Sequence, residues 1–173
     1  MSTNPANPIL FYEYVSTNSH SPESSQWSPV SSHPPNADRI SSFRVITWNI
    51  WFDRREQHVR FSAVLTELLS IPLVDVICLQ EVTTSFLDLI REDKSIRRDW
   101  LITDYTDESH RGEIVPSWYG NIFLVRKIWA GNIRGWVRKF PSSSMGRFAL
   151  IMEIANGDKC MVSLTSKIEY INM

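Results

Sequence analysis

Two apolar runs, each ending in polar residues, shape the first half of the chain. Residues 43–50 are rich in β-branched and aromatic residues and predict a strand, and residues 74–80 predict a second one. Between them, apolar residues 61, 64, 65, 68 and 69 recur at the spacing of an amphipathic helix that ends before Pro72. A strand, a helix and a strand within about 35 residues predict a crossover unit, with both strands in one sheet.

The pattern becomes strand-like in the second half. We expect a short helix capped by Thr83 or Thr84, and then strands over residues 118–125 and 136–140. Residues 148–155 and 159–165 flank Asn156-Gly157, the commonest two-residue hairpin turn, so they predict a β-hairpin. Helices followed by strands indicate a mixed α/β fold.

The N-terminal residues have a different composition. Residues 1–40 are rich in Ser, Pro and Asn and predict a disordered leader, which makes residues 41–173 the folded domain. The mostly apolar residues 9–14 interrupt this leader, either as a docking segment for a partner or as an apolar patch in a mobile tail.

Composition excludes several classes of protein. Hydrophobic content of 43% predicts a packed core, and a net charge of −1 argues against a general basic field for nucleic acid. All 18 Lys and Arg residues lie from Arg39 onward, so a local basic groove stays open. No run approaches about 18 apolar residues, so no membrane span is expected. Cys78 and Cys160 lie in apolar runs and favour reduced, buried thiols over a disulfide.

Polar residues close the two apolar runs of the crossover unit. Thr47-Trp48-Asn49 closes the first and Leu79-Gln80-Glu81 closes the second, which predicts that Asn49 and Glu81 meet at one rim of the sheet. A Glu oxygen suits a hard divalent cation such as Mg²⁺, which keeps most of its waters and needs one or two carboxylates. The Asn49 amide can orient a carboxylate, a phosphate or an imidazole. Such a pair fits metal-assisted phosphoester cleavage, whereas a solvated Glu at a turn is the alternative.

These two triplets resemble the first two motifs of the endonuclease/exonuclease/phosphatase family. Tyr119-Gly120 before a strand also fits the family pattern. Residues 140–147 (Phe-Pro-Ser-Ser-Ser-Met-Gly-Arg) and 165–169 (Thr-Ser-Lys-Ile-Glu) resemble the 5′-tyrosyl-DNA phosphodiesterase branch of that family. The resemblance covers roughly residues 43–169.

The resemblance implies a fold, an activity and a site. The fold is a four-layer α/β sandwich of the DNase I type with mixed sheets, of which this chain would hold an incomplete part. The activity is Mg²⁺-dependent (or Mn²⁺-dependent) phosphodiester hydrolysis that removes a topoisomerase tyrosine from a DNA 5′ end during DNA repair in the nucleus, with the cytoplasm as a second location. Glu81 would be the metal ligand, Asn49 a catalytic residue, and Tyr119 and Arg147 substrate-binding residues. Core packing of Tyr119 and a solvated Arg147 are the alternatives.

The chain departs from the family in its second half. It has no Gly-Asp-x-Asn motif, because Gly157-Asp158 continues with Lys159-Cys160, and it has no Ser-Asp-His motif. In the family these motifs supply the acid/base Asp and His. We therefore expect a truncated fragment that is inactive alone. Another branch of the superfamily (a nuclease, a deadenylase or a phosphoinositide phosphatase) and a non-catalytic binding remnant stay open.

Overall fold

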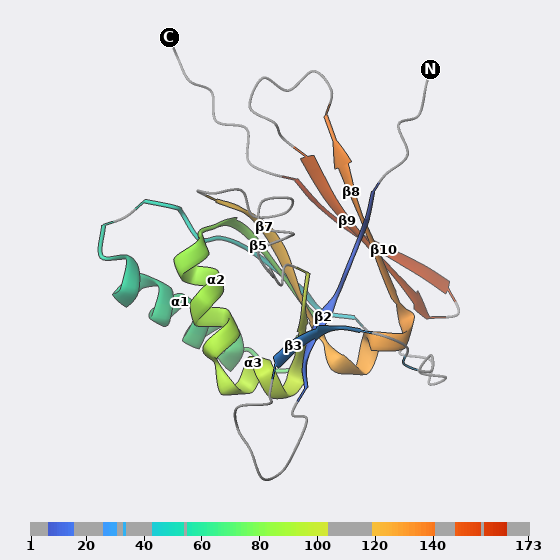
Figure 1. Cartoon of the computed structure of the whole chain (residues 1–173), viewed down its shortest axis with the longest axis horizontal. Coiled ribbons are helices and arrows are strands. Elements are labelled where there is room, and N and C mark those ends of the chain that lie inside the picture. The colour runs from blue at the N-terminus through green and yellow to red at the C-terminus, as the bar shows by residue number, and fades with distance from the viewer. Residues whose placement is uncertain are drawn as a thin grey trace.

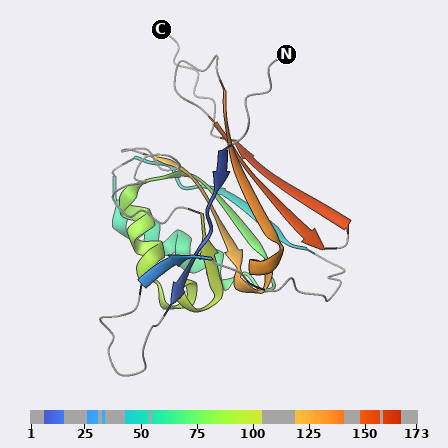
Figure 2. The ribbon, with the colours of Figure 1, turned by 45° about the vertical axis from the view of Figure 1, so that its right-hand side comes forward.

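Two β-sheets and three α-helices make up the part of the chain that the structure describes, residues 7–15, 26–30, 33, 43–53, 55–103, 119–140, 148–156 and 158–165. In this computed structural model, a six-stranded sheet has the order β3-β2-β6-β7-β5-β4, and a four-stranded sheet has the order β1-β8-β9-β10. Figure 1 shows the helices gathered on one side of the molecule and the four-stranded sheet on the other. Turning the molecule by 45° separates the layers as helices, six-stranded sheet and four-stranded sheet (Figure 2).

The predicted crossover unit is present. Strands β4 (Val45–Asn49) and β5 (Val76–Val82) pair in parallel, and helix α1 (Gln57–Ser70) connects them. Their register sets Thr47 beside Cys78 and Asn49 beside Gln80. Both triplets therefore end at the same rim of the six-stranded sheet, as the sequence predicts.

The helices cover one face of the six-stranded sheet. Helix α1 buries Phe61, Leu65 and Leu68. Helix α2 (Thr84–Glu92) begins after Thr83, whose Oγ1 accepts a hydrogen bond from the Phe86 N–H, and it is followed by α3 (Lys94–Asp99). No helix among the described residues is long and apolar enough to cross a membrane.

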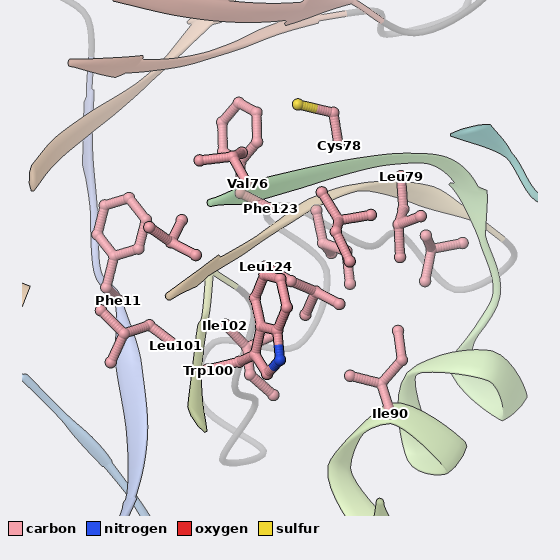
Figure 3. Packing of buried hydrophobic residues seen from close by; sticks show 14 of the residues in the cluster. Phe11, Val76, Cys78, Leu79, Ile90, Trp100, Leu101, Ile102, Phe123 and Leu124 are labelled. Atoms are coloured by element: carbon pink, nitrogen blue, oxygen red, sulfur yellow. The ribbon is translucent and has the colours of Figure 1, made fainter. Parts of the chain in front are cut away.

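The core lies on both faces of the six-stranded sheet. Figure 3 shows Val76, Cys78 and Phe123 pointing toward the four-stranded sheet, and Leu79 pointing toward the helix side with Ile90 of α2. Because successive residues of a strand point to opposite faces, one continuous apolar run fills both interfaces. All the described positions of β5 and β7 (Gly120–Arg126) are buried except Gln80 and Arg126, which are partly exposed.

The N-terminal segment is not a structureless leader. Strand β1 (Asn7–Ile9) pairs with β8 in the four-stranded sheet, and β2 (Tyr12–Val15) lies between β3 (Gln26–Pro29) and β6 (Trp100–Ile102) in the six-stranded sheet. The dark blue strands in Figure 1 thus pass from one sheet to the other. The expectation of disorder over residues 1–40 is wrong for these strands. The Ser- and Pro-rich average concealed the few apolar residues that become buried, Ile9, Phe11, Tyr12 and Trp27.

The second half builds the four-stranded sheet. The 3₁₀ helix η2 (Lys127–Asn132) leads from β7 to β8 (Ile133–Lys139), which pairs antiparallel with β9 (Phe148–Asn156). Strand β10 (Asp158–Thr165) pairs with β9 from Asp158 opposite Asn156 onward, so the predicted antiparallel pairing of the two strands is confirmed. Asn156 belongs to β9, and Gly157 of the predicted turn lies outside the described residues. The mixed α/β class with two facing sheets is also confirmed, and one helical layer with two sheets accounts for three layers of the expected sandwich.

Candidate active site

The candidate site lies where β4 and β5 end side by side. The Asn49 Nδ2 amide donates a hydrogen bond of 2.8 Å to Glu81 Oε1, and the Gln80 Nε2 amide donates one of 2.9 Å to Thr47 Oγ1. The Ile50 N–H also donates to the Gln80 carbonyl at 2.9 Å, which keeps the two strand ends together. Parallel pairing alone therefore converts two distant triplets into one polar cluster.

Glu81 has an unusual backbone and an enclosed side chain. Its φ of 57° lies in the left-handed region, and the β5–β7 register shifts between Leu79 and Val82, where the ladder is irregular. Such irregularities reorient a side chain at a sheet rim, and strained backbone collects at functional sites. The Glu81 residue is only 4% exposed. An enclosed carboxylate needs donors or a cation, because burial without them costs several kcal/mol (~2–7 for a neutral polar group, more for a charge).

The loop after β4 wraps around this carboxylate. Asn49 Oδ1 accepts a 2.8 Å hydrogen bond from the Trp51 N–H, and Glu81 Oε2 lies 3.4 Å from the Phe52 N–H. The Phe52 ring stacks on Tyr119 with centroids 4.7 Å apart and planes 8° apart. Asn49 thus uses both ends of its amide, one to hold Glu81 and the other to hold the loop.

One arginine fixes the shape of the loop. The Arg60 guanidinium of α1 donates hydrogen bonds to three backbone carbonyls, at 2.7 Å to Arg55, 2.8 Å to Trp51 and 2.5 Å to Asp53. It also lies over the Trp51 ring, 4.9 Å from its centroid. The Arg55 guanidinium hydrogen-bonds the Asp53 side chain and lowers the pKa of that carboxyl below its usual value. Hydrogen bonds therefore hold the Arg55 and Arg60 guanidinium groups in place beside the segment that follows β4.

The donor set is compatible with a hard divalent cation. Within the described part of the chain, no ion pair involves Glu81, and its two oxygens face only neutral amide groups. An enclosed carboxylate with no cationic partner is a suitable ligand for Mg²⁺, which binds oxygen and retains several waters. The described residues contain no group of three or more acidic, His or Cys side chains that could hold a metal alone. Glu81 would therefore act as one ligand among water and substrate oxygens.

Solved structures with a similar fold include several of TDP2. Zebrafish TDP2 complexed with a single-stranded DNA product matches 77% of this chain with a TM-score of 0.58 and 19% sequence identity. Caenorhabditis elegans TDP2 matches 75% with a TM-score of 0.58 and 24% identity. The chain has the fold of the N-terminal half of TDP2. No family model and no curated protein matches it.

The match is partial on the TDP2 side. This chain spans 49% of the zebrafish TDP2 structure and 36% of the C. elegans one. A second C. elegans structure, a truncated TDP2, agrees at a TM-score of 0.57 and 25% identity over 73% of this chain. The TDP2 likeness therefore covers most of this sequence and about half or less of its counterparts.

The predicted site residues have separate outcomes. Asn49 and Glu81 are brought into direct contact by a hydrogen bond. Tyr119 stacks on the ring of Phe52, whose backbone N–H donates to Glu81. Arg147 lies outside the described residues. Sequence reasoning missed Trp51 and Phe52, although their position directly after the Thr47-Trp48-Asn49 triplet was an available signal. It also missed Asn121 of β7, which is buried on the strand beside the irregular end of β5 and whose Nδ2 has no hydrogen-bond partner among the described residues.

Proposed function

We propose that this TDP2-like site serves Mg²⁺-dependent hydrolysis of a phosphodiester, with a DNA 5′ end joined to tyrosine as the substrate. The observation that carries the proposal is the hydrogen bond between Asn49 and the enclosed Glu81 carboxylate at the rim of a TDP2-like sheet. The likeness to a TDP2 complexed with single-stranded DNA supports DNA as the ligand. A nuclear location follows from the substrate and is part of the same proposal.

Each residue has a defined task in the proposal. Glu81 would hold the metal, whose positive charge, when bound, stabilises the charge that develops on the phosphate oxygens. Asn49 fixes the orientation of the Glu81 carboxylate and leaves one of its oxygens facing the loop. In the reaction, a water oxygen bonds to phosphorus and the bond from phosphorus to the tyrosine oxygen breaks. The products are a DNA 5′-phosphate and a tyrosine hydroxyl.

The chain lacks the family's acid/base motifs, which lowers the expected rate. General acid/base catalysis contributes roughly 10²–10⁴-fold. We therefore expect the purified chain to release tyrosine slowly or not at all in multiple turnover. The decisive measurement must use an excess of protein over substrate and must also follow metal binding directly.

The first prediction concerns Glu81. Glu81→Gln should abolish both Mg²⁺-dependent tyrosine release from a 5′-tyrosyl oligonucleotide and Mn²⁺ binding followed by electron paramagnetic resonance, because the amide is a poor ligand for a hard cation. Glu67→Gln, an exposed site on α1, is the matched control and should leave both unchanged. Metal binding that is equal in parent and Glu81→Gln would contradict the proposal, and so would a parent chain that binds no metal.

A further inference from the structure

An exposed indole stands at the edge of the candidate site. Trp51 follows Asn49 by two residues and is 48% exposed, although its backbone N–H donates a hydrogen bond to Asn49 Oδ1. Its neighbour Phe52 turns inward to stack on Tyr119. Of these two adjacent rings, Phe52 therefore packs against Tyr119, whereas Trp51 stays open to solvent.

The backbone holds Trp51 in this position at a cost. Its φ of 61° is in the left-handed region, which is unfavourable for a bulky side chain. The three carbonyl hydrogen bonds from Arg60, including the one to Trp51 itself, stabilise this conformation. A large apolar ring that is kept exposed by strained backbone indicates a binding residue rather than a core residue.

Cations accompany the indole. The guanidinium carbons of Arg55 and Arg60 lie 5.2 Å and 4.9 Å from the centroid of the Trp51 ring. The Arg55 side chain is 75% exposed and is held by Asp53. An exposed aromatic ring with guanidinium groups over it offers both contacts that a nucleotide needs, because a base stacks on exposed ring surface and a phosphate pairs with the cation.

We propose that Trp51 and Arg55 form a nucleotide-binding ridge that holds single-stranded DNA beside the Asn49–Glu81 pair. The inference rests on the proposed function for the choice of DNA, and it adds the residues that grip the strand. Trp51 stacks on an unpaired base, and Arg55 contacts the neighbouring phosphate. Asp53 competes with that phosphate for Arg55, so the carboxylate limits the affinity.

The test is equilibrium binding of a fluorescent, unmodified single-stranded oligonucleotide in chelator and low salt, measured by anisotropy. Trp51→Asn should weaken binding by roughly 5- to 100-fold, the loss expected from one base–aromatic stack, and Asn tolerates the left-handed backbone. Trp51→Phe should keep most of the affinity. Asp53→Asn should tighten binding several-fold, and Arg55→Gln should weaken it and reduce its salt dependence.

Leu73→Ala is the matched control for the Trp51 variants. Leu73 is also an exposed apolar residue with positive φ (57°), and it lies before β5, at the opposite end of that strand from Glu81. The Leu73→Ala variant should bind the oligonucleotide as tightly as the parent does. Equal binding by Trp51→Asn and the parent would overturn the inference, as would a parent that does not bind. The binding assay contains neither metal nor a tyrosyl bond to cleave. A failure of the hydrolysis assay therefore does not change the outcome of this binding test.

Discussion

At the scale of single residues, the site depends on the choice of an amide at position 49. Asn49 Nδ2 lies 2.8 Å from Glu81 Oε1, and an amide nitrogen donates a hydrogen bond there, whereas the carboxylate of an aspartate at this position would have no N–H group to donate. Its oxygen accepts from the Trp51 N–H at the same time. One side chain therefore links the carboxylate to the loop that carries the proposed DNA contacts.

Cys78 gives a prediction at the same scale. It is a buried free thiol of β5, and burial raises its pKa from 9.0 to about 12. In a Cys160→Ser background, we expect iodoacetamide at pH 8 to label Cys78 only after unfolding, because the thiolate is the reactive form. Rapid labelling of the native protein would contradict this.

The same shift predicts how stability depends on pH. The folded protein holds the Cys78 proton more tightly than the unfolded chain, so the stabilisation is complete below about pH 9 and is lost as the pH rises toward 12. Cys78→Ala should therefore lose less of its free energy of unfolding than the parent between pH 8 and pH 10.5. Denaturant unfolding of both proteins at these two pH values measures the difference.

At the scale of elements, the N-terminal strands matter most, because they belong to both sheets. Ile9 of β1 packs against Gly135 of β8, where a Cβ would overlap the Ile9 side chain. Phe11 is buried after it and also lies close to Gly135, and Tyr12 continues into β2. Glycine at 135 is therefore required by the close approach of the N-terminal segment.

This arrangement predicts a stability difference between adjacent residues. Ile9→Ala should lower the free energy of unfolding by about 2–4 kcal/mol, because it leaves a cavity against Gly135. Leu10→Ala is the control, since Leu10 is 50% exposed and its truncation should change stability by no more than about 0.5 kcal/mol. Urea denaturation measures both, and similar values would show that the segment does not dock.

At the scale of the whole molecule, Asp75 connects elements that are far apart in sequence. Its Oδ2 accepts the Arg44 N–H at 2.8 Å, before β4, and its Oδ1 accepts the Trp129 indole N–H at 3.1 Å, in η2. The 3₁₀ helix η2 connects the six-stranded sheet to the four-stranded sheet. The Asp75 carboxylate therefore holds this connection against the start of β4.

Asp75→Ala should therefore destabilise the protein by about 1–3 kcal/mol, since it leaves the indole N–H of fully buried Trp129 without its acceptor. Asp88→Ala, which removes a half-exposed carboxylate on α2, should cost no more than about 0.5 kcal/mol. Thermal unfolding followed by tryptophan fluorescence compares the two, and an Asp75→Ala melt equal to the Asp88→Ala melt would contradict this role.

Sequence periodicity by itself determined the local elements of this protein. The crossover of β4, α1 and β5, the β9–β10 hairpin and the meeting of Asn49 with Glu81 follow from alternation, helical spacing and the rule that parallel strands end at one rim. The helix and the hairpin depend on neighbours in sequence, and the Asn49–Glu81 contact then follows from the parallel pairing that the crossover imposes.

Only the tertiary structure decided the remaining features. The strands β1 and β2 are too short to show a pattern, and their order comes from burying Ile9 and Phe11 against β8, more than a hundred residues away, and from the pairing of β2 with β6. The positive φ of Trp51 and of Glu81, the enclosure of that carboxylate and the cations on the Trp51 ring likewise depend on contacts between elements. Burial is a property of the assembled fold, and composition averaged along the chain does not encode it.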